Sequence, residues 1–437
     1  MSIPINLERS LLLHQDAYLG DLLDKVTAIK SEGWLEELRQ GAANLVSNTT
    51  LPSTRDEEWR FTDLSALKQV KFNCVGTLHG TSLQKDLILP EVSHRLVFVN
   101  GVYAPNLSNL SDLPNGVVVG NIAALPASGV GEYLAQSQGS QEVFTALNTA
   151  GLHDLAVVWV GKNVVVETPI HLLFVSVVGE FASIYQPRVL VVAETNSQVS
   201  LIEEFVGDKQ EGVYFNNCVT EVWVNENAQV SHTRVMREGE EAFHIGKTAV
   251  TQARDSRYFS TALSLGGKLT RHNLEILQTG EQTETTLNGL TMIWGNQLGD
   301  THSALSLNHP YGVSNQLHKC IISDRAHGIF NGKVFVPKPA QLTNAAQLNR
   351  NLLLSPKARI DTKPQLEITA DNVKCAHGAT VSQLEDDEIF YLQSRGINEN
   401  DARKLLVNAF AAEVINQIPV PSLRDKLLNT VTNLTSN

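Results

Sequence analysis

Short apolar segments decide the fold of this 437-residue chain, and two examples are V-T-E-V-W-V at 219–224 and L-E-I-L at 274–277. Apolar residues in these segments alternate with polar ones or run together, which is typical of β-strands buried on one or both faces. Similar segments recur from about residue 95 to residue 368, and Gly, Asn and Asp punctuate them. No helix-sized amphipathic segment separates them, so we do not expect a doubly wound α/β sheet.

The length of this strand-rich region favours a solenoid. About 270 residues are too many for one ordinary sandwich, and a steady recurrence of short strands suits coils that stack on one another. We therefore predict a mainly β fold with a parallel β-helix core. Because the sequence repeat is not strict, a large jelly roll or two sandwiches stay open as alternatives.

Helical patterns flank the predicted core. Between about residues 8 and 46, apolar residues recur at helical spacing, with a break at Gly33. After Gly396, Asn398 is the expected N-cap of one helix, and Ser422 is the expected N-cap of a second. The C-terminal helices are interpreted as a docking module, as a cap on the apolar end of the solenoid, or as both. We divide the chain into an N-terminal helical region (1–90), a β-helix core (91–377) and a C-terminal helical domain (378–437).

Composition limits the function classes. The net charge of -12 argues against binding a nucleic-acid backbone, because that requires clustered Lys and Arg. The N-terminus lacks the basic start and apolar core of a secretory signal, and the longest apolar run, near 170–178, is too short to span a bilayer. We expect a cytoplasmic protein that binds neither nucleic acid nor membranes.

Cys375 and His377 are the candidate metal ligands. They lie two residues apart in C-A-H-G-A-T, and on an extended backbone their side chains project from the same face. Thiolate and imidazole suit a soft or borderline metal, but an iron–sulfur cluster usually takes four protein ligands. A partner must supply the rest. The other three cysteines, Cys74, Cys218 and Cys320, lie far apart with no C-x-x-C pair and are interpreted as small buried side chains.

Other apparent signals are weaker. Gly246-Lys247-Thr248 resembles the end of a phosphate-binding loop, but Glu241 stands where that loop requires glycine, so we expect no nucleotide binding by this chain. Four histidines without the spacing of a zinc site are interpreted as loop or core residues, namely His302, His309, His318 and His327. Two acidic pairs are interpreted as solvated charges, since adjacent strand residues face opposite ways, namely Glu203-Glu204 and Asp386-Asp387.

Longer motifs carry a resemblance to a known family. They include E-E-W-R-F-T at 57–62, R-H-N-L at 271–274, N-R-N-L-L-L-S at 349–355, C-A-H-G-A-T at 375–380 and Y-L-Q-S-R-G-I at 391–397. Together they resemble the SufB/SufD family of iron–sulfur cluster assembly proteins over nearly the whole chain. The chain is more similar to SufD members, because SufB members usually carry H-E-A where this chain has H-G-A and many have an N-terminal cysteine motif.

The resemblance implies a right-handed parallel β-helix between helical regions and a non-catalytic scaffold role in the SUF system. It implies pairing with SufB through the β-helix cores, docking of the SufC ATPase on the C-terminal helices, and a homodimer as a possible state in isolation. His377, with Cys375 beside it, corresponds to the residue that faces SufB at the assembly site, where iron or a transient iron–sulfur cluster is shared. Two rival roles stay open: a carbohydrate-active β-helix enzyme, and a structural stabiliser of SufB.

Overall fold

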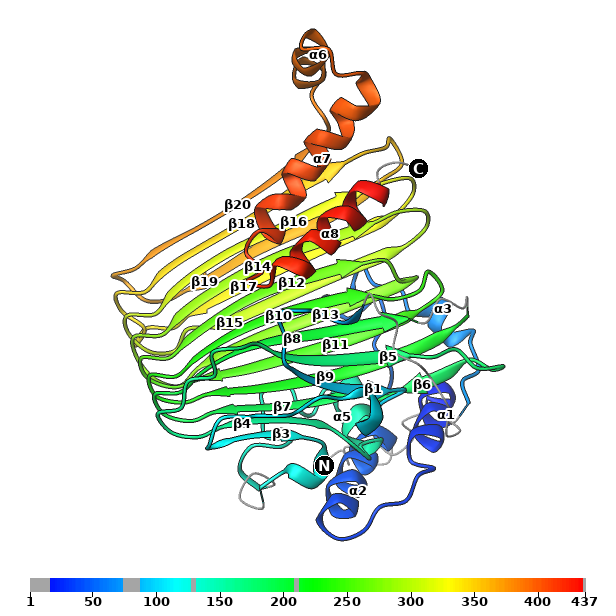
Figure 1. Ribbon diagram of the computed structural model, residues 1–437, viewed down its shortest axis with the longest axis vertical. Helices are drawn as coiled ribbons and strands as arrows, with labels where there is room; N and C mark the ends of the chain where they lie inside the picture. Colours follow the sequence, from blue (N-terminus) through cyan, green and yellow to red (C-terminus); the bar gives the residue numbers. More distant parts are fainter. Residues whose placement is uncertain (1–15, 74–86, 127–130, 208–211, 435–437) are drawn as a thin grey trace, which may run out of the picture.

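The computed structural model describes residues 16–73, 87–126, 131–207 and 212–434. Two stacked sheets of mostly parallel strands form a β-solenoid of about 8 turns (Figure 1). Sheet 1 has the order β2-β1-β5-β8-β10-β12-β14-β16-β18-β20, and sheet 2 has the order β19-β17-β15-β13-β11-β9-β7-β4-β3, with β6 beside β9. The predicted parallel β-helix is confirmed. A jelly roll is excluded because the only antiparallel pairs among the described strands are β1–β2 and β3–β4.

The strands of sheet 1 are β1 (His94–Val99), β2 (Val102–Tyr103), β5 (Ile170–Ser176), β8 (Gln198–Gly207), β10 (Gln229–Arg237), β12 (Arg257–Leu265), β14 (Glu284–Ile293), β16 (Val313–Ile322), β18 (Asn344–Leu353) and β20 (Lys374–Ser382). Those of sheet 2 are β3 (Val117–Gly120), β4 (Ala156–Val160), β6 (Ser183–Tyr185), β7 (Arg188–Ala193), β9 (Tyr214–Val224), β11 (Phe243–Gln252), β13 (Leu269–Gln278), β15 (Leu298–Ser306), β17 (His327–Val336) and β19 (Arg359–Ile368). The last strand therefore runs past residue 377, where the sequence placed the end of the core.

Tight turns between the two sheets repeat from coil to coil. One row of turns places a residue in the left-handed region at each coil, and its first members are Asn163, Asn196 and Asn227. Asparagine tolerates this conformation, and here the side-chain amides form a ladder, with Nδ2–Oδ1 distances of 2.8 and 2.9 Å. Later coils place Tyr311 and Leu342 at the same kind of turn, although their side chains favour it less.

The space between the sheets, here called the lumen, changes character along the solenoid. Near its N-terminal end it is apolar, with stacked rings of Phe98, Phe174 and Phe205 whose neighbouring centroids lie 5.3 and 5.0 Å apart. Further along, Cys218, Thr248, His272 and other polar side chains enter it, and all are buried. The core of this protein is therefore not uniformly hydrophobic.

The N-terminal region covers the outer face of sheet 2. Its elements are α1 (Ala17–Val26), α2 (Trp34–Ser47), η2 (Glu57–Trp59), α3 (Ser65–Lys68) and α5 (Val143–Ala150), with η4 (Pro105–Leu107) and η5 (Ile122–Ala124) in the loops near β1 and β3. Apolar residues of these helices, such as Leu22 and Leu147, pack on Phe215 and Phe243 of the sheet. The predicted helices before residue 46 are thus confirmed from residue 17 onward. Residues 8–15 lie outside the described residues.

The C-terminal helices are α6 (Asp386–Ser394), α7 (Glu399–Ile415) and α8 (Pro421–Leu434). Asn398 caps α7 as predicted, its side chain accepting from the Asp401 N–H. The predicted Ser422 cap is wrong: α8 begins at Pro421, and the Ser422 hydroxyl instead bonds the Glu91 carboxylate. None of the described helices combines the length and apolar character needed to cross a membrane.

The same helices do not cap the end of the solenoid. Apolar residues of α7 and α8, including Val414 and Leu427, pack on the outer face of sheet 1 against Leu290 and Ile321 (Figure 1). Buried Lys319 of β16 fixes α7 through a 2.9 Å bond to the Phe410 carbonyl and an ion pair with Glu413. In Figure 1, α6 projects beyond β20 and leaves the end of the solenoid open.

Candidate functional site

Cys375 and His377 both lie on β20, the edge strand of sheet 1 at the open end. Their register partners on β18 are Ala345 and Gln347. The two side chains share one face of β20, and Cys375 packs against the luminal core. Cys375 is half-buried and His377 is exposed. Partial burial raises the pKa of the Cys375 thiol.

The pair alone is too small a donor set for a cluster. In the described part of the chain, no three His, Cys, Asp or Glu residues converge closely enough to hold a metal ion. β19 and β20 each have one ladder partner among the described strands, β17 and β18, so both present a free edge beside this pair. An exposed strand edge is a template for pairing with another chain. Further ligands from a second protein could therefore approach Cys375 and His377 along these edges.

A file of polar side chains leads from His377 into the lumen. Gln347, the register partner of His377, donates a 2.8 Å hydrogen bond to Gln316, which in turn bonds Ser303 at 2.8 Å. Strand glycines make room for this file: a Cβ at Gly332 would collide with the Gln347 side chain, and one at Gly289 would collide with His318. Because glycine weakens a strand interior, its presence here indicates that the space for polar groups matters.

Deeper in the lumen, Cys218 belongs to a cluster of ionisable groups. Its Sγ lies 3.2 Å from His244 Nε2, and His244 Nδ1 lies 3.0 Å from a Glu238 carboxylate oxygen. Burial opposes protonation of His244, but Cys218 and Glu238 outweigh burial and raise the pKa of His244 to about 9. Thiol, imidazole and carboxylate stand in a row, but Arg234 Nη2 also lies 2.6 Å from His244 Nε2, and Cys218 is only 3% exposed. No motif in the sequence predicts this cluster, because its members come from three different strands or loops.

The acidic pair Glu203-Glu204 is buried, not solvated as the sequence suggested. The two side chains do face opposite ways: Glu203 bonds His232 at 3.1 Å in the lumen, and Glu204 bonds His171 at 3.0 Å. Burial alone would raise the pKa of Glu204, but His171 and Arg237 lower it to about 2. Asp386 and Asp387 are exposed as expected, in the first turn of α6.

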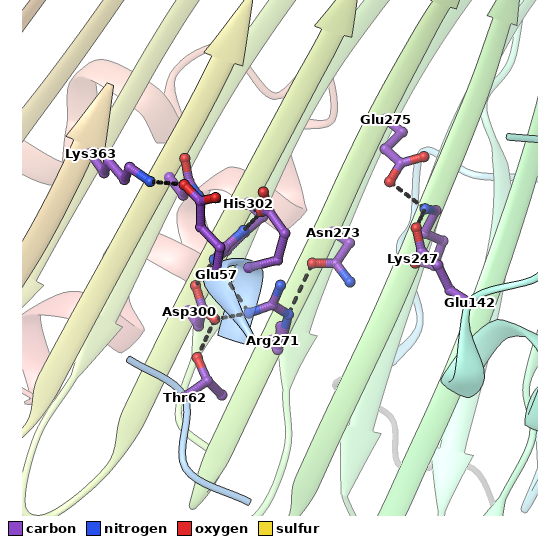
Figure 2. Close-up of polar contacts among 12 residues, drawn as sticks. Glu57, Thr62, Glu142, Lys247, Arg271, Asn273, Glu275, Asp300, His302 and Lys363 are labelled. Carbon is purple, nitrogen blue, oxygen red and sulfur yellow. Dashed lines mark hydrogen bonds and ion pairs between the residues drawn. The ribbon is translucent and has the colours of Figure 1, made fainter. Parts of the chain in front are cut away.

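A cleft of about 700 Å³ lies on the outer face of sheet 2, beneath the segments around residues 49–59 and 138–145. Its floor is a row of register partners on neighbouring strands, Lys247, Asn273, His302 and Asn331. Figure 2 shows Lys247 at one end of this row, 2.8 Å from Glu142 and 2.5 Å from Glu275.

The other end of the cleft holds a buried ion-pair network. Arg271 donates a 2.5 Å hydrogen bond to Asp300 and lies under the Trp59 ring, 3.9 Å from its centroid. Asp300 also accepts from Thr62 and lies 3.0 Å from His302 (Figure 2). His302 lies 3.2 Å from Glu58. Burial opposes protonation of His302, but Asp300 raises its pKa.

Comparison with known proteins matches both parts of the chain. Residues 19–172 match the SufBD protein N-terminal region, and residues 176–410 match the SufBD core domain of SUF system FeS cluster assembly. The chain belongs to the SufB/SufD family. An iron–sulfur cluster assembly SufBD family protein of Synechocystis is 50% identical over 405 residues, which are 90% of this chain and 89% of that protein.

A relative named SufD supports the same placement. The iron–sulfur cluster assembly protein SufD of Escherichia coli is 32% identical over 382 residues, covering 87% of this chain and 88% of that protein. The chloroplastic protein ABCI7 of Arabidopsis thaliana is 38% identical over 411 residues, covering 92% of this chain and 86% of that protein. The predicted resemblance to this family, and to its SufD members, is confirmed.

The motifs that resemble the family have distinct structural places. E-E-W-R-F-T forms η2 and the roof of the cleft, whereas Y-L-Q-S-R-G-I covers the end of α6 and its turn. On α6, Phe390 is 70% exposed and Tyr391 is 59% exposed, which is unusual for neighbouring large apolar residues. The sequence missed α6, because its polar first turn, Asp386 to Glu388, hides the helical pattern.

Cys218 and Cys320 are buried as expected, and Cys74 lies outside the described residues. His302, His318 and His327 lie on strands β15, β16 and β17 and not in turns. His318 is a core histidine, stacked 4.8 Å from the Phe330 ring, and burial lowers its pKa to about 3.

Proposed function

We propose that this chain is a non-catalytic scaffold subunit of a SUF iron–sulfur assembly complex. The observation that carries the proposal is the open end of the solenoid, where two free strand edges flank Cys375 and His377. A SufB-type partner pairs with these edges and supplies the remaining ligands for iron or for a transient iron–sulfur cluster, which is cargo and not a resident cofactor.

His377 is the more accessible ligand of the pair. Its imidazole is exposed at the boundary, and neutral imidazole is a good ligand for iron. Cys375, half-buried against the luminal core, reaches the boundary less freely. A site divided between two proteins opens when the proteins move, so release of a cluster needs no change within the β-helix.

A SufC-type ATPase docks on the C-terminal helices in this proposal. The exposed Phe390 and Tyr391 rings of α6 supply an apolar contact beside the open end. This chain itself lacks the glycine of a phosphate-binding loop at Glu241, so nucleotide chemistry belongs to the partner.

The docking surface is best tested by point substitution. Truncation after residue 397 would remove α7 and α8 and uncover Leu290, Ile321 and the rest of the apolar face that they bury. Phe390→Glu with Tyr391→Glu should instead leave the fold intact and abolish co-purification of a SufC-type subunit, because both side chains are exposed. Glu388→Gln on the same helix is the matched control. Unchanged co-purification by the double variant contradicts docking on α6.

The assembly role is tested by co-purifying the chain with SufB-type and SufC-type subunits and measuring iron and acid-labile sulfide in the complex. A role as a structural stabiliser of SufB predicts the same complex but no effect of His377 on its cluster content. A carbohydrate-active enzyme has less support, because Glu142 and Glu275, the carboxylates that meet in the cleft, are both bound to Lys247. Release of reducing sugars from acidic polysaccharides would revive that alternative.

A further inference from the structure

The cleft on sheet 2 has more carboxylates than permanent cations in its lining. Its lining contains three permanent cations, Lys247, Arg271 and Lys333, and more carboxylates than these, namely Asp56, Glu58, Glu142, Glu275 and Glu367. These cations already have partners. Lys333 pairs with Glu367 at 2.7 Å, and Arg271 donates to Asp300 and Asn273 and lies under the Trp59 ring. An anionic occupant would therefore find little free positive charge.

The Lys247 end shows the surplus most clearly. One ammonium serves two carboxylates, each through a single oxygen, and the two carboxyl groups also lie within hydrogen-bond reach of each other. Burial raises the pKa of Glu275, Lys247 opposes this, and the charge of Glu142 adds to it. A further cation at this place would relieve the repulsion between the two carboxylates.

A second, independent feature is Asn331, which lies two strands away from Asn273 on the floor of the cleft. The Asn331 side chain is only 7% exposed, and its Oδ1 has no hydrogen-bond partner among the described residues. Its amide nitrogen makes only a long, 3.5 Å contact with Glu58. Burying an acceptor without a donor is costly, so we expect an occupant of the cleft to supply an N–H donor to the Asn331 amide oxygen.

The shape and walls of the cleft narrow the choice of occupant. The floor from Lys247 to Asn331 crosses three strand spacings, roughly 14 Å. Apolar groups of Trp59, Phe144, Ala304 and Phe335 lie along it. A bare metal ion does not fit this elongated, partly apolar site, and the described acidic residues do not converge on one point. Alkyl chains, by contrast, pack on apolar walls while their charged groups reach polar partners.

We propose that this cleft binds a linear polyamine, with one ammonium group against the Glu142 and Glu275 carboxylates on the side away from Lys247 and an N–H donor near Asn331. The methylene segments lie over Ala304 and against the aromatic side chains. This site faces away from the lumen and from sheet 1, so the proposal does not depend on the role of Cys375 and His377.

The test uses the full-length protein and spermidine as the probe, titrated calorimetrically at low ionic strength. Wild-type protein should bind spermidine saturably with about one molecule per chain. Glu275→Gln should weaken binding about tenfold, the factor that corresponds to ~1.4 kcal/mol. Glu167→Gln removes an exposed carboxylate outside the cleft and should leave binding unchanged.

A second variant guards against indirect effects of changing an ion pair. Ala304→Phe keeps every charge and fills the floor between Glu275 and Lys333, so it should abolish spermidine binding with little change in the melting temperature of the free protein. The proposal is overturned by an absence of saturable binding at millimolar spermidine. It is also overturned if all variants bind spermidine equally, or if Mg²⁺ at matched ionic strength stabilises the protein as much as spermidine does. Either result would mean that spermidine is attracted only by the negative charge of the protein surface.

Discussion

Asp300→Asn should detach the N-terminal cover of sheet 2 from the solenoid. Asp300 is buried and joins Arg271 of β13, His302 of β15 and Thr62 of the cover. Burial alone would raise the pKa of Asp300, but Arg271 and His302 lower it to about 2, from an ordinary value of 3.8. This lowering of the pKa corresponds to stability on the order of 2 kcal/mol at neutral pH. This contribution is present above pH ~4 and is lost as the pH falls through the folded-state pKa.

The amide variant loses this charge and also leaves Arg271 buried without its counterion. Breaking such a pair typically costs about 3–5 kcal/mol, so we expect a loss of roughly 3 kcal/mol in the free energy of unfolding, measured by urea denaturation at pH 7. Trypsin should cleave faster after exposed Arg60, because a hydrogen bond from Thr62 to a neutral amide oxygen is weaker than the one to the Asp300 carboxylate. In a double-mutant cycle, Arg271→Met with Asp300→Asn should cost at least about 1 kcal/mol less than the sum of the single variants. A loss below about 1 kcal/mol, with unchanged cleavage, would refute the network's anchoring role.

Three further predictions concern the solenoid itself. Gly246→Ala places a Cβ about 3.0 Å from Cys218 Sγ and should lower the free energy of unfolding, measured in urea, by roughly 1–3 kcal/mol. The control Gly179→Ala, with open space around it, should lower it by less than about 1 kcal/mol. Equal losses would show that the luminal side chains move aside to admit the new Cβ. Leu342→Asn should raise the melting temperature, because asparagine tolerates the positive φ of this exposed turn better by up to about 1 kcal/mol; a lower melting temperature would count against strain there. Glu204→Gln should make the free energy of unfolding fall less steeply as the pH is lowered. The lowered pKa of Glu204, about 2, gives stability that is present above pH ~4.5 and lost on acidification through that pKa. An equally steep fall in the variant and the wild type would contradict an ionised Glu204 in the folded protein.

The strands and helix α7 were predictable because their signals are local. The apolar and β-branched residues of V-T-E-V-W-V mark β9 as a buried strand without reference to the rest of the chain, and Asn398 marks the start of α7 by its own side chain. α6 and the start of α8 were missed or misplaced, since Phe390 and Tyr391 are exposed and show no amphipathic pattern, and since Pro421 takes the first helical position.

The candidate sites depend on register between distant segments, which composition and spacing do not reveal. Cys375 and His377 could be placed on one face from strand periodicity alone, but the approach of Gln347 and Gln316 behind them requires the pairing of β16, β18 and β20. Glu203 looks like a surface charge in the sequence, because its partner His232 belongs to the next coil. The cleft likewise joins Glu58 to His302, which are far apart along the chain.

The central claim is that His377 serves the assembly site at a subunit boundary. The most direct measurement is complementation by His377→Ala of a strain that lacks the native gene and depends on this assembly system, with co-purification of the partner subunits in parallel. The imidazole is exposed on an edge strand, so we predict a soluble variant and an intact complex, with loss of growth. Thr380→Ala, on the opposite face of β20, should grow normally. Normal growth with His377→Ala would contradict the claim. If the variant loses both growth and the complex, the residue has a structural role instead.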